Sequence, residues 1–213
     1  TLTVTSDTTS AGGGGAAVVA AYQINAGLDT TAQGNGWGTG PWSSNGWGEG
    51  SSTFVETDQL RLWSEDHFGE DLLYNPRGGG VYYKDMSGSV QTRGVNITTL
   101  GNGPSQALQI AVSDNDRHAI AFGTVNLDTG VFDPLLIRWS DAEDIGQWVP
   151  NTTNTAGSLS IDSGSTFIKA VETTTETLVF TDVSLHSFKY VGPPFIFGQI
   201  RIGTNIKLIG PNA

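Results

Sequence analysis

The sequence predicts an all-β fold made of propeller-like blades, in which short antiparallel strands form small sheets. Composition is the first reason, because 29 glycines and 8 prolines among 213 residues divide the chain into short segments, as in β sandwiches, barrels and propellers. A strand phrase with Trp-Ser also occurs twice, in LRLWSEDHFGED from Leu60 and in LLIRWSDAEDIGQW from Leu135. Such repetition is typical of modular β architectures, whose units bury their apolar faces against one another.

Residues 1–55 differ from the rest and are predicted to form a Gly- and Trp-rich N-terminal arm or a small β region. The segment LTVTS alternates like a strand, and AAVVAAYQIN fits either a strand or a short helix. Residues 56–213 are predicted to form the propeller-like domain. We expect the chain to be part of a longer polypeptide.

From residue 59 onward, apolar segments are separated by Gly, Asp, Asn or Pro turns and predict a series of short strands. A unit of about 40 residues with four such strands has the size of a propeller blade. The predicted strands are 59–64, 72–77, 80–85, 107–113, 118–125, 134–140, 159–162, 166–173, 176–182, 184–192, 195–202 and 205–210.

In each Trp-Ser phrase we expect the strand to end at Trp-Ser and an acidic turn to come next. The residues predicted to be structural in this blade repeat are Trp63, Ser64, Trp139, Ser140 and Trp148.

Charge and composition exclude several classes of function. The formal net charge of −11 argues against a surface that grips nucleic acid, because phosphate binding depends on Lys and Arg. An acidic wall still suits a conduit along which DNA slides without sticking. The absence of cysteine excludes disulfides and thiolate metal sites. No apolar run reaches the length of a membrane-spanning segment.

The acidic residues Glu65, Asp66, Glu70 and Asp71 invite comparison with the carboxylate pair of a glycosidase. Asp141, Glu143 and Asp144 stand at the corresponding place in the second phrase. A catalytic pair has no reason to recur in each structural unit, whereas acids that build turns do. We therefore predict no catalytic residue here.

Other catalytic or metal-binding patterns are also weak. Asp114 and Asp116 have the alternate spacing of a calcium loop, but the expected Gly and Glu do not follow, so an Asx-type turn is the better interpretation. The histidines His67, His118 and His186 form no metal-spacing motif. Neither a Gly-x-Ser-x-Gly elbow nor a phosphate loop is present. The sequence thus predicts a protein that is not an enzyme and has no cofactor and no metal.

Two segments are candidate interfaces. Trp37, Trp42 and Trp47 recur every five residues among glycines, either as a sugar-stacking or partner-binding loop or as plugs against a neighbouring surface. Pro193 and Pro194 predict an extended stretch, with Phe195 and Phe197 on one side of it by the two-residue period of a strand.

The phrases DRHAIAFG, DPLLIRWSDAEDIGQWVPNTTNTAG, ETLVFTDVSLHSFKYVGPP and IGPNA together resemble a family of bacteriophage tail or head-completion proteins related to propeller-bearing tail nozzle or tail hub subunits. The phrase LRLWSEDHFGEDLLYNPRGGGVYY looks like the opening blade of that family, and the resemblance covers roughly residues 55–213. Propellers of the family usually carry more blades than this segment can supply, so the resemblance implies an incomplete propeller or a departure from a closed one.

The resemblance implies a non-enzymatic structural subunit of the virion tail, assembled in the host cytoplasm. Its expected partners are copies of itself in a ring and other tail or portal-adaptor proteins, with genome DNA passing nearby without sequence-specific binding. Two alternatives stay open. One is a receptor- or carbohydrate-binding tail adhesin that uses the Trp-rich loop, and the other is a propeller glycosidase that uses the acids near residue 70.

Overall fold

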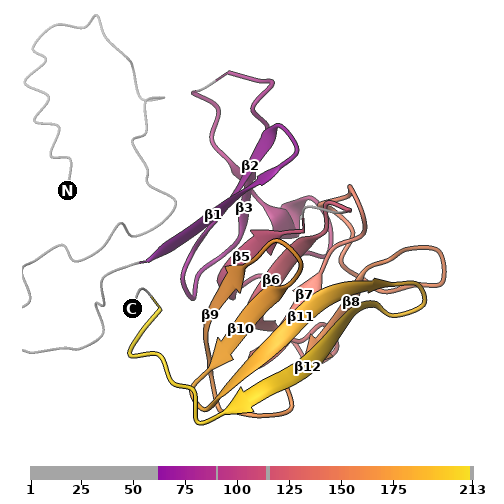
Figure 1. The fold of residues 1–213 in the computed structure, drawn as a ribbon. Coiled ribbons are helices and arrows are strands. Elements are labelled where there is room, and N and C mark those ends of the chain that lie inside the picture. Colours follow the sequence, from indigo (N-terminus) through magenta and orange to yellow (C-terminus); the bar gives the residue numbers. More distant parts are fainter. Residues whose placement is uncertain (1–61, 90, 114–115, 212–213) are drawn as a thin grey trace, which may run out of the picture. The chain divides into compact units, whose positions relative to one another are not determined.

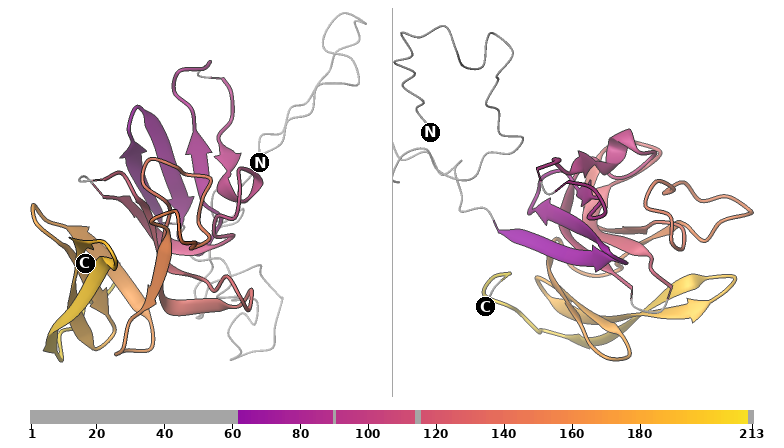
Figure 2. Two further views of the ribbon diagram at one scale, coloured as in Figure 1. Left: turned by 90° about the vertical axis from the view of Figure 1, so that its right-hand side faces the viewer. Right: turned by 90° about the horizontal axis from the view of Figure 1, so that it is seen from above.

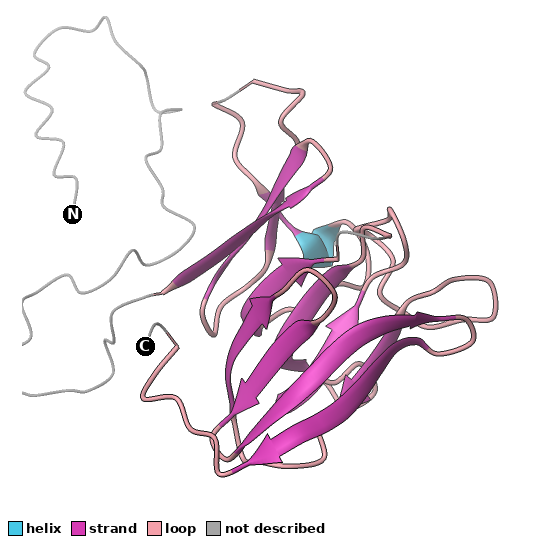
Figure 3. Ribbon diagram, viewed as in Figure 1, coloured by secondary structure: helices cyan, strands magenta, loops and turns pink. Residues whose placement is uncertain are grey.

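The computed structural model describes residues 62–89, 91–113 and 116–211, which belong to one compact unit beginning at Leu62. This part of the chain is all-β and contains three four-stranded antiparallel sheets, none of which closes on itself (Figures 1 and 3). In each sheet the strands lie side by side in chain order, so every sheet is a simple meander. The predicted all-β class is confirmed.

Each sheet is formed by four strands that are consecutive in the chain. The first sheet contains β1 (Trp63–Phe68), β2 (Asp71–Pro76), β3 (Tyr82–Lys84) and β4 (Val95–Asn96), and a short 3₁₀ helix follows at Ile97–Thr99. The second sheet contains β5 (Ala107–Val112), β6 (Ala119–Val125), β7 (Phe132–Trp139) and β8 (Gly157–Ser160). The third sheet contains β9 (Phe167–Glu172), β10 (Thr177–Thr181), β11 (Ser184–Gly192) and β12 (Ile196–Thr204).

The second sheet is buried on both faces, and β6 shows why its sequence allows this. All of Ala119, Ile120, Ala121 and Phe122 are buried, and successive side chains of a strand point to opposite faces. The two alanines pack with residues of the first sheet, whereas Ile120 and Phe122 pack with residues of the third. The small alanine side chains therefore allow the first sheet to pack closely, and the large Ile120 and Phe122 side chains fill the space between the second and third sheets.

Aromatic rings fill the space between the second and third sheets. Phe122 stacks on Phe167 with ring centroids 5.4 Å apart, and Phe188 meets Phe122 edge to face at 6.1 Å. Trp139 meets Phe197 edge to face at 5.2 Å. Rings in these offset and edge-on arrangements add attraction to the apolar area that they bury. Figure 2 shows the three sheets as separate layers.

Most predicted strands are present, but one predicted strand is absent and one short strand was not predicted. Residues 205–210, which were predicted to form a strand, lie outside the third sheet, which ends at Thr204. The short β4 was not predicted, because its two residues have no periodic pattern.

The two Trp-Ser phrases do not occupy equivalent positions. Trp63 begins β1, the first strand of its sheet, whereas Trp139 ends β7, the third strand of its sheet. Glu65 and Asp66 consequently lie inside β1, and the predicted acidic turn is found only after Trp139. The repeated phrase is a similarity of sequence alone, and the structural repeat is the four-stranded meander instead.

The segment around Pro193 is a turn, so the predicted extended stretch is wrong. It joins β11 to β12, and Phe195 N donates a hydrogen bond to Gly192 O (3.1 Å). The peptide bond between Pro193 and Pro194 is cis, and Ile196 has a positive φ of 48°. Phe195 belongs to the turn, before β12 begins at Ile196, and is 76% exposed, whereas Phe197 within β12 is buried.

Among the described residues, no helix is both long and apolar enough to cross a membrane.

Candidate functional site

The first strands of the three sheets lie close together, and side chains of one strand satisfy the free backbone edge of the next. Strand β5 is an edge strand, so its outward N–H groups lack a neighbouring strand. Ile110 N donates to Ser64 Oγ (3.1 Å), and Val112 N donates to Asp66 Oδ2 (2.7 Å). Ser64 and Asp66, on β1, therefore replace the missing strand and attach the first sheet to the second.

Gln109 repeats this arrangement one sheet further along. Its Nε2 donates to Ala170 O (2.8 Å), and its Oε1 accepts from Ala170 N (2.9 Å). The amide side chain thus pairs with both backbone groups of one residue on β9, as a neighbouring strand would. Because buried backbone groups must find partners, this bond pair helps fix how the third sheet packs on the second.

Arg77, directly after β2, contacts both other sheets. Its Nη1 donates to Leu108 O (3.4 Å), its Nη2 donates to Phe167 O (3.2 Å), and its guanidinium lies 5.8 Å from the centroid of the Phe167 ring. Burial lowers the pKa of Arg77 from its usual value. The side chain thereby ties the strand edges of the second and third sheets to the first.

The first strands of the three sheets, β1, β5 and β9, line a groove with a volume of about 420 Å³. Its charged side chains are of both signs. Several backbone groups at its strand edges already have side-chain partners, which leaves few for an added peptide strand. The lining residues are Leu62, Trp63, Ser64, Glu65, Asp66, Arg77, Leu108, Gln109, Ile110, Ala111, Lys169, Ala170, Glu172 and Pro211.

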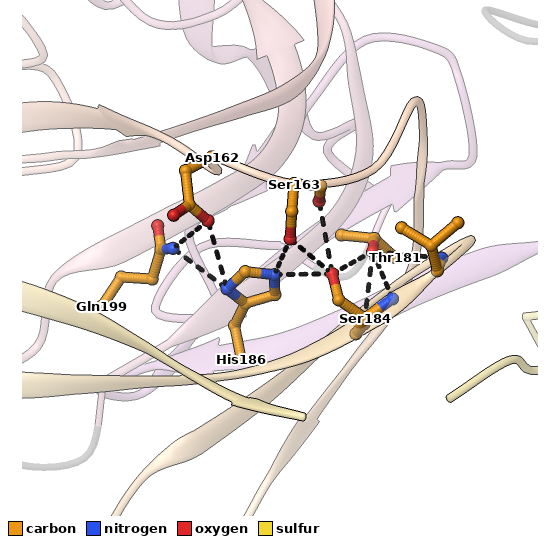
Figure 4. Close-up of polar contacts among 7 residues, drawn as sticks. Asp162, Ser163, Thr181, Ser184, His186 and Gln199 are labelled. Atoms are coloured by element: carbon orange, nitrogen blue, oxygen red, sulfur yellow. Dashed lines mark hydrogen bonds and ion pairs between the residues drawn. The ribbon is translucent and has the colours of Figure 1, made fainter. Parts of the chain in front are cut away.

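The arrangement that most resembles a catalytic centre lies in the third sheet (Figure 4). Ser184 Oγ is 2.8 Å from His186 Nε2, and His186 Nδ1 is 4.0 Å from Asp162 Oδ1. Sequence reasoning missed it, although Ser-x-His on a strand places both side chains on one face. The residue types match a Ser-His-Asp triad, so the direction of each hydrogen bond decides what it can do.

The bond directions oppose general-base chemistry. Gln199 Nε2 lies 3.3 Å from Asp162 Oδ1, and because a carboxylate only accepts, the amide nitrogen must donate there. The same nitrogen is 2.9 Å from His186 Nδ1, which therefore accepts, and the ring proton sits on Nε2. Nε2 consequently donates to Ser184 Oγ and cannot remove its proton.

Access to this network is also closed. Ser184 and His186 are fully buried, and Ser184 Oγ contacts Thr181 Oγ1 (2.8 Å) and Ser163 Oγ (2.8 Å) as well. Desolvation lowers the pKa of His186, which favours the neutral form of the ring. The network holds the β10–β11 turn against the segment before β9.

A second buried histidine plays a similar part in the second sheet. Thr155 Oγ1 donates to Asp141 Oδ1 (2.6 Å), so His118 Nε2 donates to Thr155 Oγ1 (2.9 Å). Burial lowers the pKa of His118, and hydrogen bonds from Thr155 and Ala142 lower the pKa of Asp141 against the opposing effect of its own burial. Asp141 is therefore an anchor for the loop that follows β7, in agreement with a turn-building role.

The other acids that the sequence singled out have structural partners or lie on the surface. Asp71 begins β2, accepts a hydrogen bond from the Tyr83 hydroxyl and also accepts from Met86 N (2.9 Å). The hydrogen bond to Asp71 contributes, after desolvation, to raising the pKa of Tyr83 to about 12. Glu70 is exposed in the turn before β2. Neither acid lines the groove.

Asp144 and Glu143 lie in the loop after β7. Asp144 Oδ1 accepts from Gly146 N (2.8 Å), and Glu143 pairs with Arg117 across 3.4 Å on the surface. Among the described residues, no group of three or more His, Asp or Glu side chains is arranged to hold a metal ion.

The remaining predicted residues divide by burial. Trp139 and Trp148 are buried, and their Nε1 atoms donate to Thr155 O (2.9 Å) and Ile145 O (2.8 Å). Ser140 Oγ accepts from Ala119 N (3.0 Å). Trp63, by contrast, is 49% exposed, and Pro193, Pro194 and Phe195 are exposed at the β11–β12 turn. Residues Trp37, Trp42 and Trp47 lie outside the described residues.

Comparison with known proteins adds no relative: no protein-family model and no curated protein sequence matches this chain.

Proposed function

We propose that this chain is a non-enzymatic structural subunit whose three sheets are consecutive blades of a β-propeller. The observation that carries the proposal is the repeated stacking of four-stranded meanders through their first strands, with Ser64, Asp66 and Gln109 satisfying the next strand edge each time. Propellers repeat such sheets radially around an axis. The groove lined by β1, β5 and β9 corresponds to that axis.

The proposed role is in assembly because both ends of the stack present apolar faces. Trp63 on the first sheet is 49% exposed, and Ile200 and Ile202 on the third sheet are 61% and 53% exposed. Exposed apolar patches of this kind mark protein interfaces. Ser184 and His186 are buried, and their hydrogen bond runs in the direction opposite to that of a catalytic pair, which supports the view that the polar networks stabilise the fold.

We further propose that the assembly is a phage tail, with this subunit around the DNA exit channel. The resemblance of its phrases to those of tail nozzle and tail hub proteins supports this setting, and the net charge of −11 suits a wall past which DNA slides.

Virus particles purified from cells that carry the gene provide the test. Mass spectrometry should detect peptides of this chain in the particles, and gold-labelled antibodies should bind at the tail. A chain found only in the soluble cell fraction would reject the virion role.

A further inference from the structure

The outer face of the third sheet, which points away from the second sheet, carries two rows of mostly apolar side chains across its strands. Cross-strand pairing places Val171, Leu178, Ser187 and Ile200 in one row. The second row contains Lys169, Phe180 and Leu185, and Ile202 lies beside it on the same side of β12. Val171, Ile200 and Ile202 are exposed on this face, which we call the tail face.

The outer face of the first sheet, which we call the head face, is the counterpart at the other end of the stack. Tyr74 stacks on Tyr82 with ring centroids 5.4 Å apart, and the ring of Trp63 is tilted relative to Tyr74 with their centroids 6.3 Å apart. Glu65 lies opposite Tyr74 on the same face. Because the two tyrosines cover each other's ring faces, the row exposes mainly edges, which suits protein packing better than stacking on a sugar.

The contacts between successive sheets predict which residues of the third sheet would meet a further sheet. On β1, Ser64 reaches Ile110 of β5, and on β5, Gln109 reaches Ala170 of β9. Within β5, Gln109, whose side chain bonds to the following sheet, comes directly before Ile110, whose backbone bonds to a side chain of the preceding sheet. By the same spacing, Lys169, directly before Ala170 on β9, would bond to a following sheet. Glu65, directly after Ser64 on β1, would receive a bond from a preceding sheet.

Among the described residues, no sheet follows the third for Lys169 to contact, and no sheet precedes the first to contact Glu65. Lys169 has three donors and no acceptor, so it suits a carbonyl or carboxylate oxygen, and Glu65 offers both. No ion pair of Lys169 is present in the described part of the chain. Lys169 on the tail face therefore has a charge opposite to that of Glu65 on the head face, and both faces carry exposed apolar side chains.

We propose that the tail face of one copy packs on the head face of a second copy, with Lys169 against Glu65, so that copies associate head to tail. This inference rests on the proposed structural function and names its partner as the same chain. A heterologous contact of this type forms a closed ring when its rotation closes and a filament when it does not. It continues the stacking that the chain already uses twice.

Sedimentation velocity over a range of concentrations tests whether the tail face carries the contact. The wild-type chain should self-associate, and the double variant Ile200→Lys with Ile202→Lys should weaken association by about 100-fold or more, because two charges would enter an apolar contact. Ile209→Lys is the matched control, since Ile209 is fully exposed and lies beyond β12. A wild-type chain that stays monomeric at about 100 µM overturns the proposal. Equal loss in the control does so as well.

A charge exchange tests the head-to-tail direction. Glu65→Lys and Lys169→Glu should each weaken self-association by about tenfold, because each places like charges together. Mixing the two variants should restore association, since each then meets the opposite charge on the other. Failure of the mixture to associate, or a Glu65→Lys protein that associates like wild type, rejects the contact. Circular dichroism and melting temperature confirm that the variants are folded.

The result is separable from the proposed function. Detection of the chain in virus particles together with a monomeric purified chain would reject this interface and leave the virion role standing. Self-association of a chain that is absent from particles would do the reverse.

Discussion

Two buried histidines show how single residues stabilise this protein. His186 and His118 each donate from Nε2 to a hydroxyl, which in turn bonds a loop or a turn. Neither ring is placed to accept a proton from its hydroxyl partner, so the residue types of a triad occur without its chemistry. Ser184 is a structural acceptor in a closed network.

A serine-reactive fluorophosphonate probe should therefore not label Ser184 in the folded protein. The hydroxyl is buried and accepts its hydrogen bond from His186, so it lacks both access and an activating base. Intact-mass spectrometry after incubation with the probe measures labelling. Labelling that disappears in a Ser184→Ala variant would contradict this assignment.

The same histidines should make stability depend on pH. Burial lowers the pKa of both rings from the ordinary value of 6.5, and for His186 nearby Arg201 lowers it further while Asp162 opposes the shift. Below about pH 6.5 the unfolded chain binds protons that the native chain does not. The free energy of unfolding therefore decreases as the pH is lowered, by up to about 1.4 kcal/mol per pH unit for each histidine. Stability from this source is complete above pH 6.5.

Urea unfolding at pH 7.5 and 5.5 measures this effect. The variant His186→Gln should be less stable at pH 7.5 but should lose less stability between the two pH values. An unchanged pH slope in the variant would show that His186 does not contribute.

At the scale of the elements, β6 determines how the sheets stack. Its alternation of alanine with Ile120 and Phe122 gives one face to each neighbouring sheet. Sequence reasoning identified β6 as a strand but assigned it no two-sided role, because a short, wholly apolar segment has no polar face to show its orientation.

Replacement of Phe122 by alanine should lower the free energy of unfolding by about 3–5 kcal/mol, since the ring is buried between Phe167 and Phe188. Ile200→Ala, on an exposed strand surface, should change it by less than about 1 kcal/mol in the monomer. Urea denaturation compares the two. Similar losses in both variants would be inconsistent with a core at Phe122.

The strand-edge bonds of Gln109 give a second prediction for the elements. Gln109→Leu keeps the approximate size of the side chain but leaves Ala170 N and Ala170 O without their partners, which should cost about 1–3 kcal/mol. Gln91→Leu, at an exposed position, is the control. Equal stability of the Gln109 variant and wild type would show that water replaces the bonds.

At the scale of the whole molecule, the acidic net charge predicts that the chain binds DNA weakly. With 21 acidic and 10 basic residues, the chain should give no shift of double-stranded DNA in a gel at about 50 mM salt, because few cations are present to release counterions. A salt-dependent shift would contradict the view of an acidic wall.

The sequence by itself determined the all-β class and most strand positions, such as the agreement at Ser184–Gly192, because turn residues and apolar segments act locally. Only the tertiary structure decided which strands are equivalent. It placed Trp63 at the start of one strand and Trp139 at the end of another, so the repeated phrase was a misleading guide to the repeat. Gln109 meets Ala170 across 61 residues of sequence, and no local pattern encodes a contact between residues so far apart.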